Sequence, residues 1–203
     1  MAKAKSVFFC QNCGAESSKW MGRCPQCGEW NTLVEEIIKE TKHSRTPSRG
    51  IGNQTTKPTA LPDIEISSIA RVSTTFGEID RVLGGGIVPG ALMLLGGDPG
   101  IGKSTLLLQV SQKVADTVGT VLYASGEESQ LQLKLRAERL HINSERLQVI
   151  ADTDLDHILE QADAMTPSLL VIDSIQTMYT GDIDAAPGSV SQVRECTSRL
   201  LRF

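Results

Sequence analysis

Aromatic side chains are scarce in this sequence of 203 residues, because Phe, Trp and Tyr together make up only 4% of it. So low a content gives no sign of the stacking platform that single-strand binding proteins use. No apolar run approaches the roughly 20 residues that span a bilayer. The first residues also lack the apolar stretch of a secretory signal. We therefore expect a cytoplasmic protein with no membrane partner.

The charged residues are unevenly distributed along the chain. Residues 1–60 carry nine Lys and Arg against five Asp and Glu, whereas residues 61–203 carry 11 against 19. A basic first segment hints at an anionic partner, but a solvated surface is the simpler interpretation. With 40% hydrophobic and 22% charged residues, the chain as a whole has the composition of an ordinary globular protein.

The composition changes twice along the chain and predicts three parts. Residues 1–38 hold four of the five cysteines and are too few to fold on an apolar core alone. Residues 39–65 are rich in Ser, Thr, Pro and Gly, which is typical of a flexible linker. From residue 66 to 203, apolar runs alternate with segments of helical periodicity, and we expect this part to be the main domain.

The main domain is predicted to be α/β with a mostly parallel sheet, because strands separated by helices imply right-handed crossovers. A capping-box pattern at Thr75–Glu78 predicts a short helix. The predicted strands are 91–95, 121–124, 147–150 and 169–172, and the long predicted helices are 103–118, 129–141, 154–164 and 189–203. No cap or breaker closes the last helix, so we expect the domain to be truncated at residue 203.

A glycine-rich segment between the first predicted strand and the first long helix matches the pattern G-x-x-x-x-G-K-[ST]. Its residues are Gly97, Asp98, Pro99, Gly100, Ile101, Gly102, Lys103 and Ser104, followed by Thr105. Backbone amides of such a loop bind phosphates together with the positive end of the helix. Lys103 would contact the β- and γ-phosphates, Ser104 would ligate Mg²⁺ and Thr105 would reach the α-phosphate.

Carboxylates follow two of the other predicted strands. Asp173 ends an apolar run, and Glu127 and Glu128 follow another. Carboxyl ends of parallel strands meet at one edge, where Asp173 would hold Mg²⁺ and Glu127 would activate the attacking water. Glu128 is the substitute for Glu127, and the alternative is that the two glutamates only begin the next helix.

The four clustered cysteines form two C-x-x-C pairs, Cys10 with Cys13 and Cys24 with Cys27. This spacing predicts one tetrahedral Zn²⁺ site that is structural, because four thiolates leave no open position. Disulfides are improbable in an intracellular chain. Trp20 and Trp30 flank the second pair, and we expect them to pack inside the small domain rather than to bind nucleic acid.

The order of these motifs is itself distinctive. The ribbon and linker are followed by Leu83-Gly84-Gly85-Gly86-Ile87-Val88-Pro89-Gly90, the phosphate loop, Ser125-Gly126-Glu127-Glu128-Ser129 and Val171-Ile172-Asp173-Ser174-Ile175-Gln176. The stretch Pro187-Gly188-Ser189-Val190-Ser191-Gln192-Val193-Arg194-Glu195 follows. Over its whole length the chain resembles the RecA-like ATPases of bacterial DNA repair.

The resemblance implies a RecA-like P-loop NTPase core behind a zinc ribbon, with ATP, Mg²⁺ and Zn²⁺ as cofactors. It further implies a DNA-dependent ATPase that promotes branch migration on recombination intermediates. Single-stranded or branched DNA, a homo-hexameric ring and replication or recombination proteins would be its partners. The segment after Asp173, to about Gly188, matches a DNA-facing loop. The family's Lys-Asn-Arg-Phe-Gly motif and its domain resembling Lon protease are not found in these residues.

One other function fits the same motifs. ATP would set the oligomeric state of a binding module, and the zinc ribbon would recruit a partner without useful hydrolysis. A pure switch of this kind needs no water-activating carboxylate, so Glu127 discriminates between the two hypotheses.

Overall fold

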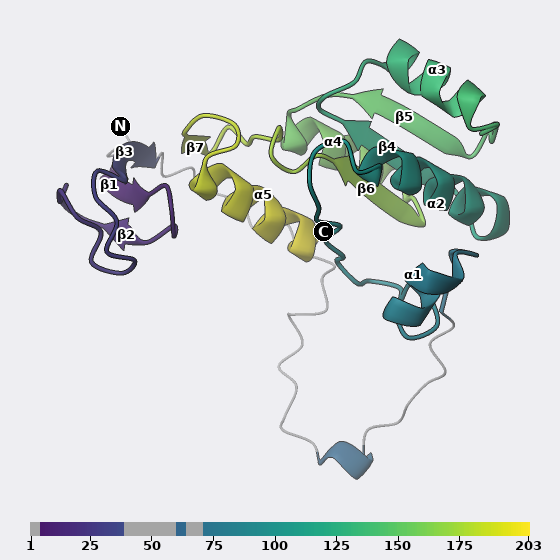
Figure 1. Ribbon diagram of the computed structural model, residues 1–203, viewed down its shortest axis with the longest axis horizontal. Helices are drawn as coiled ribbons and strands as arrows, with labels where there is room; N and C mark the ends of the chain where they lie inside the picture. Colours follow the sequence, from purple (N-terminus) through teal and green to yellow (C-terminus); the bar gives the residue numbers. More distant parts are fainter. Residues whose placement is uncertain (1–4, 39–59, 64–70) are drawn as a thin grey trace. The chain divides into compact units, whose positions relative to one another are not determined.

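The computed structural model describes residues 5–38, 60–63 and 71–203 (Figure 1). The predicted linker of residues 39–65 lies largely outside this part. The chain divides into two compact units. The ribbon unit comprises Met1–Gly50, Asp152–Gln161 and Ser174–Phe203, and the sheet unit comprises Ile51–Ala151 and Ala162–Asp173. No helix within the described residues is both long and apolar enough to cross a membrane.

The sheet unit is built around three parallel strands in the order β5-β4-β6. Their bounds are β4, Val121–Ser125; β5, Leu147–Ala151; and β6, Leu169–Asp173. Every residue of β4 is buried, as expected of a central parallel strand. These strands confirm the predicted apolar runs and the α/β fold class.

Helices α1, Gly77–Val82, α2, Lys103–Thr117, and α3, Gln130–Arg139, belong to the same unit. Helix α2 contacts all three strands (Figure 1). In the core of the unit, Leu108, Val114 and Ala115 of this helix pack with Val121 and Tyr123. The long helices lie where periodicity predicted them. The predicted short helix is present as α1, but its capping box is wrong, because the N-cap is Phe76 and the side chain of Phe76 makes no capping hydrogen bond.

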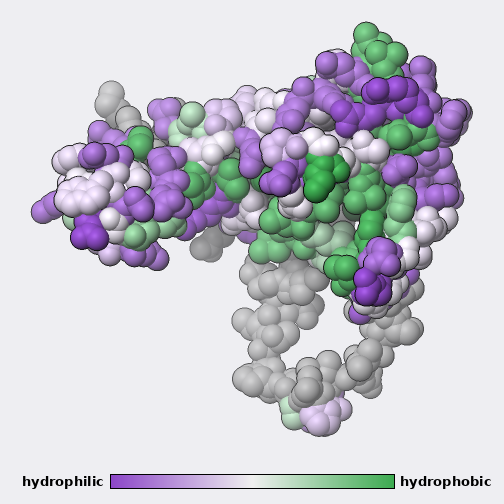
Figure 2. Space-filling model, viewed as in Figure 1, coloured by the Kyte–Doolittle hydropathy of each residue, from purple (hydrophilic) through white to green (hydrophobic). Residues whose placement is uncertain are grey.

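The predicted strand at residues 91–95 is also wrong. This segment has no regular secondary structure, and Leu92, Leu94 and Leu95 are 48%, 87% and 42% exposed. Hydrophobic side chains are visible on the surface of the sheet unit (Figure 2). An apolar run becomes a strand only when a neighbour accepts its hydrogen bonds, and among the described residues β6 pairs with β4 alone.

The ribbon unit contains a small antiparallel sheet in the order β2-β1-β3-β7. Its strands are β1, Lys5–Cys10; β2, Glu16–Ser17; β3, Leu33–Ile38; and β7, Ile183–Asp184. Helix α5, Val190–Arg202, completes the unit, with Ser189 as its N-cap. Helix α4, Leu155–Met165, begins in the ribbon unit and ends in the sheet unit, and η1, Leu61–Asp63, is a single 3₁₀ turn.

Candidate nucleotide and metal sites

The glycine-rich loop leads directly into α2. Gly100 and Gly102 take φ values of 79° and 102°, and Gly102 is the N-cap of the helix. Such positive φ values favour glycine, which explains why the pattern needs it here. Within the described residues no side chain caps this helix start. Its backbone N–H groups and its positive dipole end are therefore suited to an anion.

Lys103, the first residue of α2, points back into this loop. Its Nζ donates hydrogen bonds to the carbonyl oxygens of Gly97 at 2.8 Å and Asp98 at 2.9 Å. Ser104 and Thr105 follow on the first helical turn and are half-buried. All nine predicted residues from 97 to 105 thus lie in one loop and the helical turn that it enters.

The predicted carboxylates share one edge of the sheet. Strands β4 and β6 are parallel, with Ser125 opposite Asp173, so both strands end at the same carboxyl edge. Helix α2 ends at Thr117, shortly before β4 begins, and packs back along the strands. Its 15 residues span about 22 Å, longer than the strands, so its first residue reaches the carboxyl edge.

The two glutamates after β4 have different surroundings. Glu127 is exposed to solvent, whereas Glu128 is half-buried and forms an ion pair with Arg136 of α3. The second carboxylate oxygen of Glu128, Oε2, is buried and accepts no hydrogen bond from the described residues. The side chain of Glu128 is therefore held by Arg136, and Glu127 is the better placed of the two to meet a water molecule.

The start of α3 tests the alternative in which these glutamates only begin the helix. Ser129 is the N-cap, and its side chain forms a capping box with Gln132. The first turn contains no acidic residue. Both glutamates precede the cap, so the helix-start interpretation is wrong for this turn.

Tyr123 is a site residue that the sequence interpretation missed. Its side chain is fully buried in β4, and its hydroxyl donates a hydrogen bond to Oδ2 of Asp173 at 2.5 Å. Burial and then the neighbouring carboxylate raise the pKa of Tyr123, so the phenol stays a donor. The feature of the sequence that could have identified this residue is a tyrosine within an apolar run, because a buried phenol needs a hydrogen-bond partner.

Removing this hydroxyl is expected to weaken magnesium binding. In the full-length protein, Tyr123→Phe leaves one oxygen of Asp173 without its donor and loosens the carboxylate's orientation. We expect the Mg²⁺ concentration for half-maximal ATP hydrolysis to rise about 3- to 10-fold. The affinity for a fluorescent ATP analogue without metal stays unchanged, while the increase in that affinity on adding Mg²⁺ becomes smaller. Lys113→Ala, at an exposed lysine of α2, is the control, and an unaltered magnesium titration for Tyr123→Phe contradicts the assignment.

The four clustered cysteines of the ribbon converge as predicted. Their sulfur atoms all lie within 4.8 Å of one another, and none forms a disulfide. The distances Cys10 Sγ to Cys27 Sγ and Cys13 Sγ to Cys24 Sγ are both 3.7 Å. Four thiolates about 2.3 Å from one Zn²⁺ stand about 3.8 Å apart in a tetrahedron. The cysteines therefore fit one structural zinc ion.

Two tight turns and one hydroxyl support these ligands. Gly14 and Gly28 take φ values of 71° and 78°, and each donates its N–H to the carbonyl of the first cysteine of its pair. The hydroxyl of Thr32 lies 3.2 Å from Cys10 Sγ. The hydrogen bond with Thr32 is the largest cause that lowers the pKa of Cys10 to about 6, and it favours the thiolate that binds metal.

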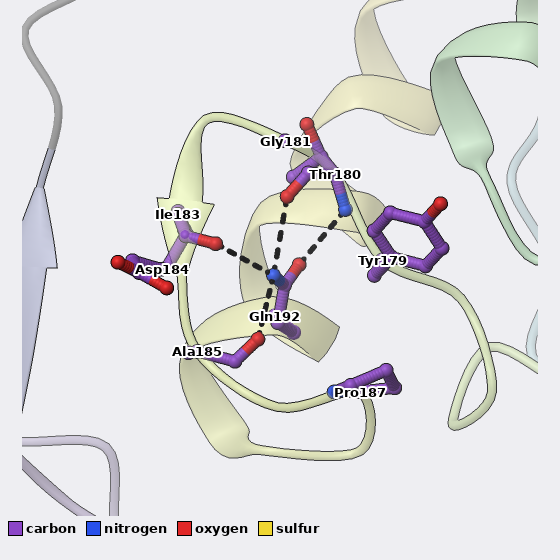
Figure 3. Close-up of a pocket in the computed structure, with 8 residues that line it drawn as sticks. All are labelled: Tyr179, Thr180, Gly181, Ile183, Asp184, Ala185, Pro187 and Gln192. Atoms are coloured by element: carbon purple, nitrogen blue, oxygen red, sulfur yellow. Dashed lines mark hydrogen bonds between the residues drawn. The ribbon is translucent and has the colours of Figure 1, made fainter.

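The segment that follows Asp173 is fixed by one buried side chain of α5, Gln192. Its Nε2 donates to the carbonyl oxygens of Thr180, Ile183 and Ala185, and its Oε1 accepts from the N–H of Thr180 (Figure 3). A pocket of about 360 Å³ lies beside it, lined by Tyr179, Thr180, Gly181, Ile183, Asp184, Ala185, Pro187 and Gln192. Gln192 thus gives the predicted DNA-facing segment a defined shape.

Comparisons with known proteins match both parts of the chain. Residues 55–203 match a family described as AAA domain, and residues 8–35 match one described as rubredoxin metal binding domain. The chain is 56%, 51% and 53% identical to proteins named DNA repair protein RadA from Bacillus subtilis, Halalkalibacterium halodurans and Listeria monocytogenes. Each match covers 100% of this chain but 44% of the relative. These matches confirm the resemblance that the motif order predicted.

Proposed function

Because this chain belongs to the AAA domain family, we propose that it is the nucleotide-binding part of a DNA-dependent ATPase in recombinational DNA repair. One arrangement supports the proposal: Glu127 and Asp173 follow parallel strands that end at the same edge of the sheet, and the helix that begins at Lys103 packs back along those strands. That edge is where α/β proteins bind ligands. The name of the relatives, DNA repair protein RadA, supports the biological setting.

In the proposed reaction, the backbone N–H groups of residues 97–102 bind the phosphates of ATP, and the ammonium group of Lys103 neutralises their charge. Ser104 and Asp173 would hold Mg²⁺, which would stabilise the charge that develops on the phosphates. The carboxylate of Glu127 accepts a proton from the water that attacks the γ-phosphorus. The bond from that phosphorus to the bridging oxygen breaks, and ADP and phosphate leave.

The finer parts of the proposal concern the whole protein, since this chain spans 44% of the length of the relatives that it matches. We place it in the cytoplasm as a homo-hexamer that promotes branch migration on recombination intermediates, with replication or recombination proteins as partners. Residues 174–188 contact single-stranded or branched DNA, and the hydrogen bonds of Gln192 support this role by ordering that segment. We also propose domain boundaries at residues 38 and 65.

The two glutamates provide a sharp test. In full-length protein with single-stranded DNA present, Glu127→Gln is expected to lower the ATP hydrolysis rate about 10²- to 10⁴-fold, because an amide accepts no proton from water. ATP binding and thermal stability remain near wild type. Glu128→Gln is the matched variant: it weakens the ion pair with Arg136 and destabilises the fold by about 1 to 2 kcal/mol, but retains more activity.

Steady-state hydrolysis by both variants, with and without single-stranded DNA, checks the proposal. The reverse ranking, with Glu128→Gln inactive and Glu127→Gln active, would identify Glu128 as the base. If DNA failed to stimulate the wild-type enzyme, the motor function would be refuted, and the ATP-gated binding module would be the better description.

A further inference from the structure

Both tryptophans of the chain are exposed on the ribbon. Trp20 is 58% and Trp30 is 67% exposed, so the expectation that they pack inside the small domain is wrong. The ribbon's buried cluster consists instead of Cys10, Cys24 and Leu33. Exposing two large indole rings to water is unfavourable. Exposed aromatic rings of this kind are typical of a surface that binds a partner.

The two rings lie beside the same glycine. A Cβ atom built on Gly22 would lie 3.8 Å from Cη2 of Trp20 and 3.8 Å from Cζ3 of Trp30. The Gly22 carbonyl accepts a hydrogen bond of 2.8 Å from the N–H of Asn31, next to Trp30. The backbone two residues after Trp20 is therefore joined to the residue after Trp30, and the two rings beside Gly22 form one surface, the Trp20–Trp30 face.

A cation reinforces this face. The guanidinium of Arg23 lies over the Trp30 ring, 5.8 Å from its centroid, and its Nε donates to the carbonyl oxygen of Gly28 at 2.8 Å. Arg23 and Trp30 also face each other in an antiparallel bridge. The arginine thus packs against the Trp30 ring and places a positive charge next to it.

We propose that the Trp20–Trp30 face binds single-stranded nucleic acid, with bases stacked on the two indole rings and phosphates near Arg23. Aromatic rings beside basic side chains are how proteins bind single strands without reading sequence. The guanidinium of Arg23 is the positive charge that this face offers to a phosphate. This inference rests on the proposed function, since it assigns a second contact for the DNA on which the ATPase acts.

The experiment uses the zinc-loaded chain of 203 residues and a thymidine 20-mer. The chain's only two tryptophans form this face, so their fluorescence reports on it directly. We expect the oligonucleotide to quench this fluorescence to saturation. The dissociation constant from quenching should equal the one from the fluorescence anisotropy of a labelled 20-mer. Trp20→Ala and Trp30→Ala each weaken binding about tenfold, whereas Trp30→Phe, which keeps an aromatic ring, weakens it less. Zinc content confirms that each variant folds.

Leu131→Ala, at an exposed apolar residue of α3, is the control and should bind like wild type. If anisotropy shows binding while tryptophan emission and both alanine variants stay unchanged, the inference is overturned and the proposed function stands. If the alanine variants lose a protein partner but keep oligonucleotide affinity, the face is a protein-docking site and the inference is again overturned. DNA-stimulated ATP hydrolysis by the full-length protein tests the proposed function separately.

Discussion

Lys103→Ala in the full-length protein is expected to lower the rate of ATP hydrolysis about a thousandfold or more. The ammonium group is the point charge that stabilises the β- and γ-phosphates as negative charge shifts between them, and nothing in alanine replaces it. The substitution also removes the two hydrogen bonds to the carbonyl oxygens of Gly97 and Asp98, so the loop loses its internal tie. Steady-state phosphate release with saturating ATP and DNA measures the effect.

Lys113→Ala is the matched control for this prediction. Lys113 is an exposed lysine of the same helix, α2. The control should retain activity within about twofold, because exposed substitutions remote from a site change little. Turnover by Lys103→Ala close to that of Lys113→Ala would mean that this loop is not where the phosphates bind.

Removal of zinc is expected to unfold the ribbon while the α/β sheet remains. Among the described residues, the ribbon buries the cluster of Cys10, Cys24 and Leu33 and, beside it, Phe9, which is too little apolar area to hold about 35 residues folded. Structural zinc in small domains contributes about 10 to 16 kcal/mol of apparent binding free energy. A chelator or Cys24→Ser should therefore abolish bound zinc and β1 to β3, and leave the hydrogen-exchange protection of β4, β5 and β6.

Cys196→Ala is the control for the zinc ligands. Cys196 is the fifth cysteine, fully buried outside the cluster, and burial raises the pKa of its thiol to about 11. This variant should keep one zinc per chain. Zinc content well below one per chain in freshly purified, reduced wild-type protein would contradict the metal assignment.

Local sequence patterns predicted most of the sheet unit. Strands β4, β5 and β6 are apolar runs of ordinary length, and their order along the chain already implied parallel pairing. The shared edge of Glu127 and Asp173 followed from that pairing alone. The phosphate loop was recognisable because each of its residue types has a chemical reason.

The wrong predictions share a cause, which is dependence on distant partners. Whether residues 91–95 become a strand depends on a neighbouring strand edge and not on their own apolarity. The tryptophans were expected to be core because a small domain needs one, but sulfur atoms occupy that position in the ribbon. The bond from Tyr123 to Asp173 joins residues 50 positions apart, which no local pattern encodes.

The turn between β4 and α3 has a mechanical consequence. Only residues 126–128 separate the end of the buried strand from Ser129, which caps the helix. So short a connection limits how far the strand end and the helix start can move independently. A shift of the backbone at Glu127 would therefore also move the start of the helix. Helix α3 carries Leu131 and Leu135 on its solvent side, 69% and 52% exposed. Any displacement of the helix start would therefore also move this exposed apolar surface.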